Sequence, residues 1–141
     1  MKNKLLTIML IILVSITLIG IVALILVMQF SKESHDEAPT IDEIIEASID
    51  IPEITTNLAE DEFIRLSLKI QTDSAKAGEE LTKRDFQVKN IIIQELSEMT
   101  AKELEGKAGK QAFQNTLKLQ INELMQDGEV QQVYITSYII Q

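Results

Sequence analysis

Hydrophobic residues fill one continuous stretch near the start of the chain, from Leu5 to Met28, which contains no charged residue and no proline. A helix of about 20 apolar residues spans the ~30 Å hydrocarbon core of a bilayer. A signal peptide usually has only ~7–15 apolar residues and a small-residue cleavage site, and a buried core helix shows a polar stripe. The stretch has none of these features. It predicts an uncleaved transmembrane helix, whose hydroxyl groups bond to carbonyls one turn earlier. These hydroxyls belong to Thr7, Ser15 and Thr17.

Charged residues on the two sides of this stretch predict its orientation. Lys2 and Lys4 precede it, whereas Lys32 follows it and is itself followed closely by acidic residues. Lysine and arginine are enriched on the cytoplasmic side of a membrane. We therefore expect the N-terminus in the cytoplasm and everything after position 30 outside it.

A polar segment and a short helix are expected to follow. Positions 31–39 are small, charged and aperiodic, as in a solvated linker, and they include the only histidine, His35. Thr40 and Glu43 have the spacing of a capping box, which predicts a helix over about 41–48. Pro52 ends any helix before it. The predicted organisation is an N-terminal region with the transmembrane helix (1–30), a linker with a short helix (31–52) and an extracytoplasmic domain (53–141).

Strict alternation of apolar and polar residues over 63–72 is the clearest periodic pattern of the outer domain. It predicts a strand with one buried and one solvated face. A β-prone segment at 53–58 predicts a preceding strand, and the acidic residues 59–62 form the turn between them. The two segments are expected to form an antiparallel hairpin.

Helical periodicity follows. Apolar residues recur at helical spacing over 75–99, which predicts one long helix. Thr100 and Glu103 form a second capping box that starts a short helical turn, and Gly106 is expected to break it. Positions 107–125 predict another helix, with Phe113, Leu117 and Ile121 on one face.

The last stretch, about 130–141, predicts a strand. We expect Val133, Ile135 and Ile139 on one face and Tyr134, Tyr138 and Ile140 on the other. Because both faces are apolar, the strand should be an inner strand or one that meets a neighbour.

The order of elements, β-β-α-α-β apart from the short turn, predicts an α+β fold. After the transmembrane helix and linker, we expect a small antiparallel or mixed sheet with helices on one face.

Charge and composition limit the partners. Ten basic and 22 acidic residues follow position 32, so this part carries a formal charge of −12. Nucleic acid and anionic lipid headgroups repel such a domain. The chain contains no cysteine, which excludes disulfides and thiolate metal sites.

Candidate chemistry is scarce. The single histidine lies in the predicted linker, so no serine-histidine pair is expected, and we predict no enzyme, no cofactor and no metal site. Calcium binding by the acids at 60–62 is a weak alternative, because their spacing does not match an EF-hand. Arg84 and Asp85 form either a surface pair with neighbouring charges or a salt bridge to another subunit or to the terminal strand. Together with Tyr134 and Tyr138, they are the candidate subunit contacts.

Several short motifs together resemble the flagellar basal body-associated protein FliL family over nearly the whole chain. The most specific is the ending V-x-x-V-Y-I-T-S-Y-I-I-Q, which starts at Val130. The other motifs are Thr56-Asn57-Leu58, Lys83-Arg84-Asp85 before Ile91-Ile92-Ile93, Leu104-Glu105-Gly106-Lys107 and Ile121-Asn122-Glu123-Leu124.

The resemblance implies a single-pass protein of the cytoplasmic membrane in a motile bacterium, at the flagellar basal body. It implies an outer domain similar to stomatin/prohibitin-type domains, which associate into rings, and a supporting role for the ion-driven stator of the MotA/MotB type. No catalytic residue of the family exists to carry over. A membrane-anchored sensor or ligand-binding domain is the alternative. A pilin-like subunit is disfavoured, because no glutamate lies in the apolar stretch.

Overall fold

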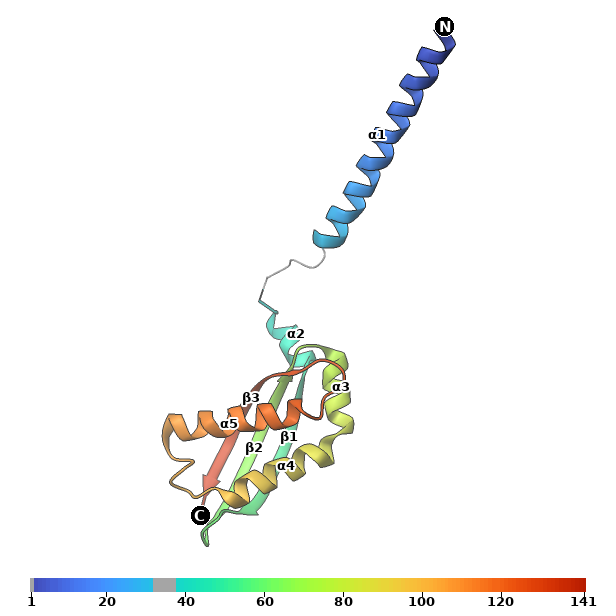
Figure 1. Cartoon of the computed structure of the whole chain (residues 1–141). Coiled ribbons are helices and arrows are strands. Elements are labelled where there is room, and N and C mark those ends of the chain that lie inside the picture. Colours follow the sequence, from blue (N-terminus) through green and yellow to red (C-terminus); the bar gives the residue numbers. More distant parts are fainter. Residues whose placement is uncertain (1, 32–37) are drawn as a thin grey trace. The chain divides into compact units, whose positions relative to one another are not determined.

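The computed structural model describes residues 2–31 and 38–141 (Figure 1). The chain divides into two compact units, Met1–Ala38 and Pro39–Gln141, and each is described by itself. Positions 32–37 of the predicted linker, including His35, lie outside the described residues.

The first unit contains one long helix, α1 (Lys2–Ser31), and an 18-residue window within Lys2–Met28 has a mean hydropathy of 3.2. Its apolar side chains are exposed along this length, with Leu5 67% and Met28 61% accessible. The helix is compatible with a membrane anchor. The predicted hydroxyl bonds are confirmed. Each hydroxyl group of the apolar stretch therefore has a hydrogen-bond acceptor within the helix and needs none from its surroundings. The bonds run from Thr7 Oγ1 to Asn3 O (2.7 Å), from Ser15 Oγ to Ile11 O (2.8 Å) and from Thr17 Oγ1 to Leu13 O (2.8 Å).

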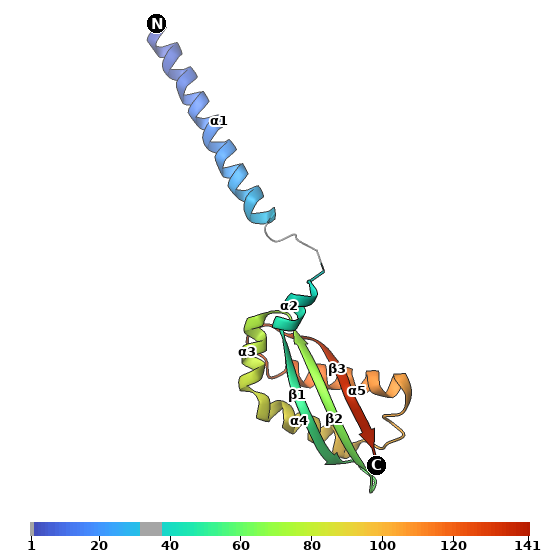
Figure 2. The ribbon, with the colours of Figure 1, turned by 180° about the vertical axis from the view of Figure 1, so that it is seen from behind.

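The second unit is an α+β domain built on a three-stranded antiparallel sheet, so the predicted fold class is confirmed in outline. The strands are β1 (Ser48–Asn57), β2 (Phe63–Thr72) and β3 (Val130–Ile140), in the order β1-β2-β3. The helices α3 (Ala75–Lys83), α4 (Asp85–Glu98) and α5 (Gly106–Asn122) cover one face of the sheet (Figure 1). No helix formed by residues 38–141 covers the other face, as the view from behind shows (Figure 2). A short helix, α2 (Ile41–Glu46), precedes β1 and starts with the predicted capping box.

The core lies between β2 and the covering helices. Strand β2 has the predicted bounds, and its even-numbered residues from Ile64 to Ile70 are at most 1% exposed. The helices contribute residues at helical spacing, which are Leu81 from α3, Val88, Ile92 and Leu96 from α4, and Phe113, Leu117 and Ile121 from α5. Burial of this apolar surface is the main force that holds the helices on the sheet.

Strand β1 starts earlier than predicted, at Ser48 instead of position 53, and Pro52 lies within it. The ladder to β2 shifts register between Ile51 and Ile54, so Pro52 lies at the irregularity. Proline lacks a backbone N–H group and is tolerated in a sheet only at edges and bulges. Because β1 is an edge strand, it continues through Pro52. The preceding helix α2 ends at Glu46, before Pro52.

The predicted single helix over 75–99 is wrong, because the chain forms two helices, α3 and α4, that meet at Arg84. Three helices, α3, α4 and α5, lie between β2 and β3, whereas the predicted order β-β-α-α-β has only two. Arg84 has φ −93° and ψ 12°, outside the helical region, which redirects the chain. The break lets α3 pack on β1 and β2, while α4 packs on β1 and α5.

The last strand differs from its prediction in two ways. It is an edge strand of the described sheet, so the first predicted alternative, an inner strand, is wrong, while the second, an edge that meets a neighbour, stays a prediction. In addition, Ser67 pairs with Ser137 whereas Leu68 pairs with Ile135, so Thr136 is an extra residue in β3. Such a bulge exchanges the faces of the residues that follow it.

The bulge corrects the predicted faces of the strand. Val133, Ile135, Tyr138 and Ile140 pack against the core, whereas Tyr134 and Ile139 are 42% and 44% exposed.

The break before the last helix lies at Gly106, as predicted, where φ is +71°. Glycine adopts this left-handed conformation without steric cost. Helix α5 ends at Asn122, three residues before the predicted end. The chain continues there in tighter turns, with Leu124 N bonded to Ile121 O, and the Asn122 side chain bonds to the start of β3.

Candidate interaction surfaces

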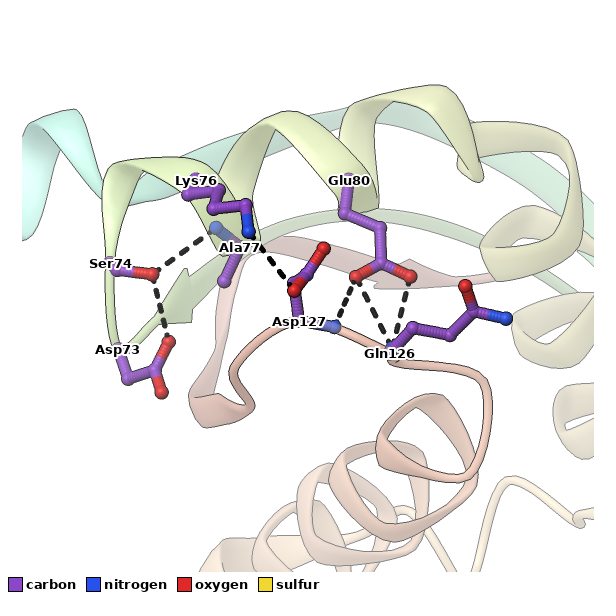
Figure 3. A network of polar contacts seen from close by, with 7 residues as sticks. All are labelled: Asp73, Ser74, Lys76, Ala77, Glu80, Gln126 and Asp127. Carbon is purple, nitrogen blue, oxygen red and sulfur yellow. Dashed lines mark hydrogen bonds and ion pairs between the residues drawn. The ribbon is translucent and has the colours of Figure 1, made fainter.

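A polar network joins α3 to the loop that leads into β3 (Figure 3). The Glu80 carboxylate accepts hydrogen bonds from the backbone N–H groups of Gln126 (3.1 and 3.2 Å) and Asp127 (2.7 Å). It also accepts one from Arg84 Nε at 2.7 Å. Lys76 Nζ lies 3.1 Å from an Asp127 carboxylate oxygen, and the Ser74 hydroxyl accepts from Ala77 N at the start of α3. One carboxylate thereby satisfies two loop N–H groups that have no strand partner.

The pKa of Glu80 is lowered below the ordinary value of a glutamate. The main cause is the hydrogen bond from the Asp127 backbone N–H, and the Arg84 guanidinium adds to it. Both donors favour the ionised carboxylate. Glu80 is therefore a structural anion that is charged at neutral pH, and it is not set up to act as a general acid.

An open depression of about 540 Å³ lies beside the network. Its walls are mostly long charged side chains. They come from Lys76, Glu79, Glu80, Lys83, Arg84, Phe86, Gln87, Gln126 and Asp127. An enclosed ligand site is typically lined by apolar and aromatic groups around a few polar ones. The depression lacks this character, so it gives little support to a sensor domain.

The predicted candidates Arg84 and Asp85 lie at the junction of α3 and α4. Arg84 contacts Glu80 and donates from Nη1 to Gln87 Oε1 at 3.0 Å, which links the two helices across their break. Asp85 pairs with Lys89 Nζ at 2.7 Å, one turn along α4. Both residues thus have partners within the chain, as in the predicted surface pair. Their role as subunit contacts stays a prediction.

The other two candidates lie on opposite faces of β3. Tyr134 lies on the open face, where its hydroxyl group is 2.9 Å from Gln71 Oε1 on β2. Tyr138 lies on the covered side, and Lys110 Nζ of α5 stands 4.5 Å from the centre of its ring. The structure therefore does not bring the four candidates into one site.

One helix face follows the edge of β3. The residues Lys110, Gln114, Lys118 and Asn122 recur every four positions on α5. Gln114 Nε2 donates to Val133 O at 2.6 Å, while Asn122 accepts from Val130 N at 2.6 Å and donates to Val130 O at 3.2 Å. These amides satisfy edge groups of the strand that no neighbouring strand takes in the described part of the chain.

Sequence reasoning missed Glu80, Gln114 and Asn122. All three side chains bind backbone groups. Because every residue has a backbone, the sequence contains no recognisable partner residue that would reveal these bonds. The one available signal was their position on polar stripes beside buried ones. Among residues 2–31 and 38–141, no group of three or more histidine or acidic side chains is placed to hold a metal ion, and this includes the acids at 60–62.

The fold defines a class of protein, a small α+β domain with a three-stranded antiparallel sheet that follows an apolar N-terminal helix in the chain. The family model "Flagellar basal body-associated protein FliL" matches residues 48–141. The chain is 48% identical over 110 residues to "Flagellar protein FliL" of Bacillus subtilis (strain 168), which covers 78% of this chain and 79% of the relative. It is 26% identical over 93 residues to "Flagellar protein FliL" of Aquifex aeolicus (strain VF5), which covers 64% and 58%.

The chain belongs to the FliL family of flagellar basal body-associated proteins. The family resemblance found in the sequence is thus confirmed. The protein has a flagellar, structural role and is not an enzyme.

Proposed function

We propose that this protein supports the ion-driven stator of the flagellar motor during motility and chemotaxis, as a membrane-anchored scaffold. The observation that carries the proposal is the combination of a FliL-type domain with an apolar helix and interaction surfaces, with no reactive site among the residues that the structure describes. Its partners would be stator proteins of the MotA/MotB type. In this proposal α1 spans the cytoplasmic membrane once, with the N-terminus inside and the domain outside.

A ring is the assembly that suits this role. The proposed outer domain is of the stomatin/prohibitin type, and its copies associate side by side. Anchoring confines the copies to a plane, which raises their effective concentration for lateral contacts. A contact between two different surfaces closes into a ring when each copy is rotated about a common axis.

The proposed mechanism is a shift of population. A stator has a free form and an engaged, conducting form, and a scaffold that fits the engaged form better moves the equilibrium toward it. The size of the shift is limited by the difference between the two affinities. No chemical step by the scaffold is needed.

Motor measurements on single cells test this function. A strain that lacks the protein should hold fewer stator units per motor and give less torque under high load, and the full chain should restore both. As a matched control, the outer domain should be expressed without α1 and with a cleavable export signal, which should not restore them. Normal stator number and torque in the deletion strain would refute the proposal.

Topology is tested separately with single-cysteine variants, since the chain has no cysteine of its own. A membrane-impermeant maleimide applied to intact spheroplasts should label Thr55→Cys on β1 and should not label Lys2→Cys. The reverse labelling pattern would refute the proposed orientation.

A further inference from the structure

The elements at the two sides of the sheet carry opposite charge, because α2 and β1 are acidic and α5, which packs beside β3, is basic. Residues 39–57, which form α2 and β1, contain five acidic residues and no lysine or arginine. The acids are Asp42, Glu43, Glu46, Asp50 and Glu53. All five are exposed, and of these Asp50 also pairs with Lys69 of β2 at 2.8 Å.

On the opposite side of the sheet, helix α5 is basic and strand β3 is uncharged. Helix α5 carries Lys107, Lys110 and Lys118 and no acidic residue, and β3 has no charged residue at all. In a domain whose formal charge is −12 beyond position 32, neither α5 nor β3 contains an acid, and the acids that directly flank them are Glu105, Glu123 and Glu129. Both views of the ribbon show the first turns of α5 projecting past β3 (Figures 1 and 2).

The backbone of β3 is also available for a partner along part of its length. Gln114 and Asn122 satisfy edge groups only at Val133 and Val130. Beyond the bulge at Thr136, the strand is uncharged and contains no proline, and it has no strand partner on its outer side within residues 38–141. Natural edges are usually protected by charges or proline, and an edge without them is suited to a contact.

We infer that the α5–β3 edge of one copy binds the α2–β1 edge of a second copy. Opposite charges select this pairing, and like charges disfavour both the acidic edge against itself and the basic edge against itself. The contact joins two different surfaces, so each copy keeps one free edge of each kind and further copies add in the same sense. The inference rests on the proposed ring and assigns its contact surfaces.

Paired single cysteines test the contact in the full, membrane-anchored chain. Thr136→Cys places a thiol at the bulge of β3, and Thr55→Cys places one on the exposed side of β1. Differently tagged copies that carry one cysteine each are co-expressed and treated with a short bifunctional maleimide. Cross-links are expected between unlike copies and not between two like copies, and added salt should lower their yield.

Charge exchange identifies the surfaces. Lys107→Glu with Lys118→Glu in the Thr136→Cys copy should reduce the cross-link several-fold, and Asp42→Lys with Glu46→Lys in the other copy should restore it. Lys110 is left in place because it stacks on Tyr138. The matched control is Lys83→Glu with Lys102→Glu, which changes the net charge equally at two exposed positions outside α5 and should leave the yield unchanged.

The outcomes separate this inference from the proposed function. Cross-links between two Thr136→Cys copies would show a symmetric contact and overturn the inference. Copies that co-purify without the unlike cross-link would overturn it as well, while the ring scaffold would stand. Copies that remain monomeric in the membrane would refute both the contact and the ring.

Discussion

The two edge strands of the sheet are protected in different ways. Strand β1 has its own protection, because Pro52 lies at a register shift and acidic residues flank it. Strand β3 has no charge and no proline, and part of its edge is covered by the amide side chains of α5. The stability of β3 should therefore depend on α5 more than the stability of β1 depends on any one helix.

The largest expected effect comes from the attachment of α5 to the core. Phe113 of α5 is 1% exposed, so Phe113→Ala should lower the free energy of unfolding by about 3–5 kcal/mol. The matched control is Phe86→Ala on α4, because Phe86 is 71% exposed and its loss should cost less than about 0.5 kcal/mol. Denaturant unfolding of the full chain in detergent micelles, followed by circular dichroism, measures both. Equal effects would contradict the assigned core.

Asn122 connects the end of α5 to the start of β3 by two hydrogen bonds to one residue, Val130, which is fully buried. Asn122→Ala leaves the N–H and C=O groups of Val130 without these partners, which should cost about 2 kcal/mol. Asn90→Ala on the exposed side of α4 is the control and should be near neutral. Hydrogen exchange should also show faster exchange of the Val130 amide in the Asn122 variant. An unchanged rate would mean that α5 does not protect the edge.

The comparison of the edges also shows what the sequence could reveal. The bounds of β2 and the stripes of the helices were predictable, because burial of one face imposes a period on the residues themselves. The bulge at Thr136 was not, since it depends on how β3 pairs with β2, which no local pattern records. It moved Ile139 to the open face and Tyr138 to the covered one.

The helix break at Arg84 was hidden for a related reason. No glycine or proline marks it, and Leu81 and Val88 keep the same phase on either side. The break arises because α3 and α4 pack on different parts of the domain. The charges of Arg84 and Asp85 made these residues candidate contacts in the sequence. Their hydrogen-bond and ion-pair partners within the chain could not be predicted, because they depend on where the helix breaks.

A smaller loss of stability is expected at the β1 side, where Thr72 forms hydrogen bonds to Ala47, the residue before β1. The Thr72 hydroxyl lies 2.6 Å from Ala47 O and 2.8 Å from Ser74 O, and it donates to one of them at a time. Thr72→Val keeps the shape and loses this bond, which should cost about 1 kcal/mol, because the Thr72 N–H still donates to Ala47 O. Thr55→Val at an exposed position of β1 is the control. A cost as large as that of Asn122→Ala would show that the two edges depend equally on single side chains.

The smallest effect concerns the charge of Glu80, which ties the loop before β3 to α3. Because the pKa of Glu80 is lowered in the folded state, chiefly by the Asp127 N–H, its contribution to stability is fully present above the ordinary pKa of a glutamate, about 4.3. The contribution is lost as the pH falls through the lowered value. Glu80→Gln should therefore destabilise the protein at neutral pH and have less effect in acid.

Thermal melting of both chains over a series of pH values measures this difference. The gap between wild type and Glu80→Gln should close on acidification, whereas Glu79→Gln, an exposed neighbour, should show no such gap. Glu43 and Glu103 also have a lowered pKa, caused first by the backbone N–H of Thr40 and of Thr100. Since both remain in every variant, they cancel from the comparison. A gap that stays constant with pH would mean that Glu80 acts through shape and not through its charge.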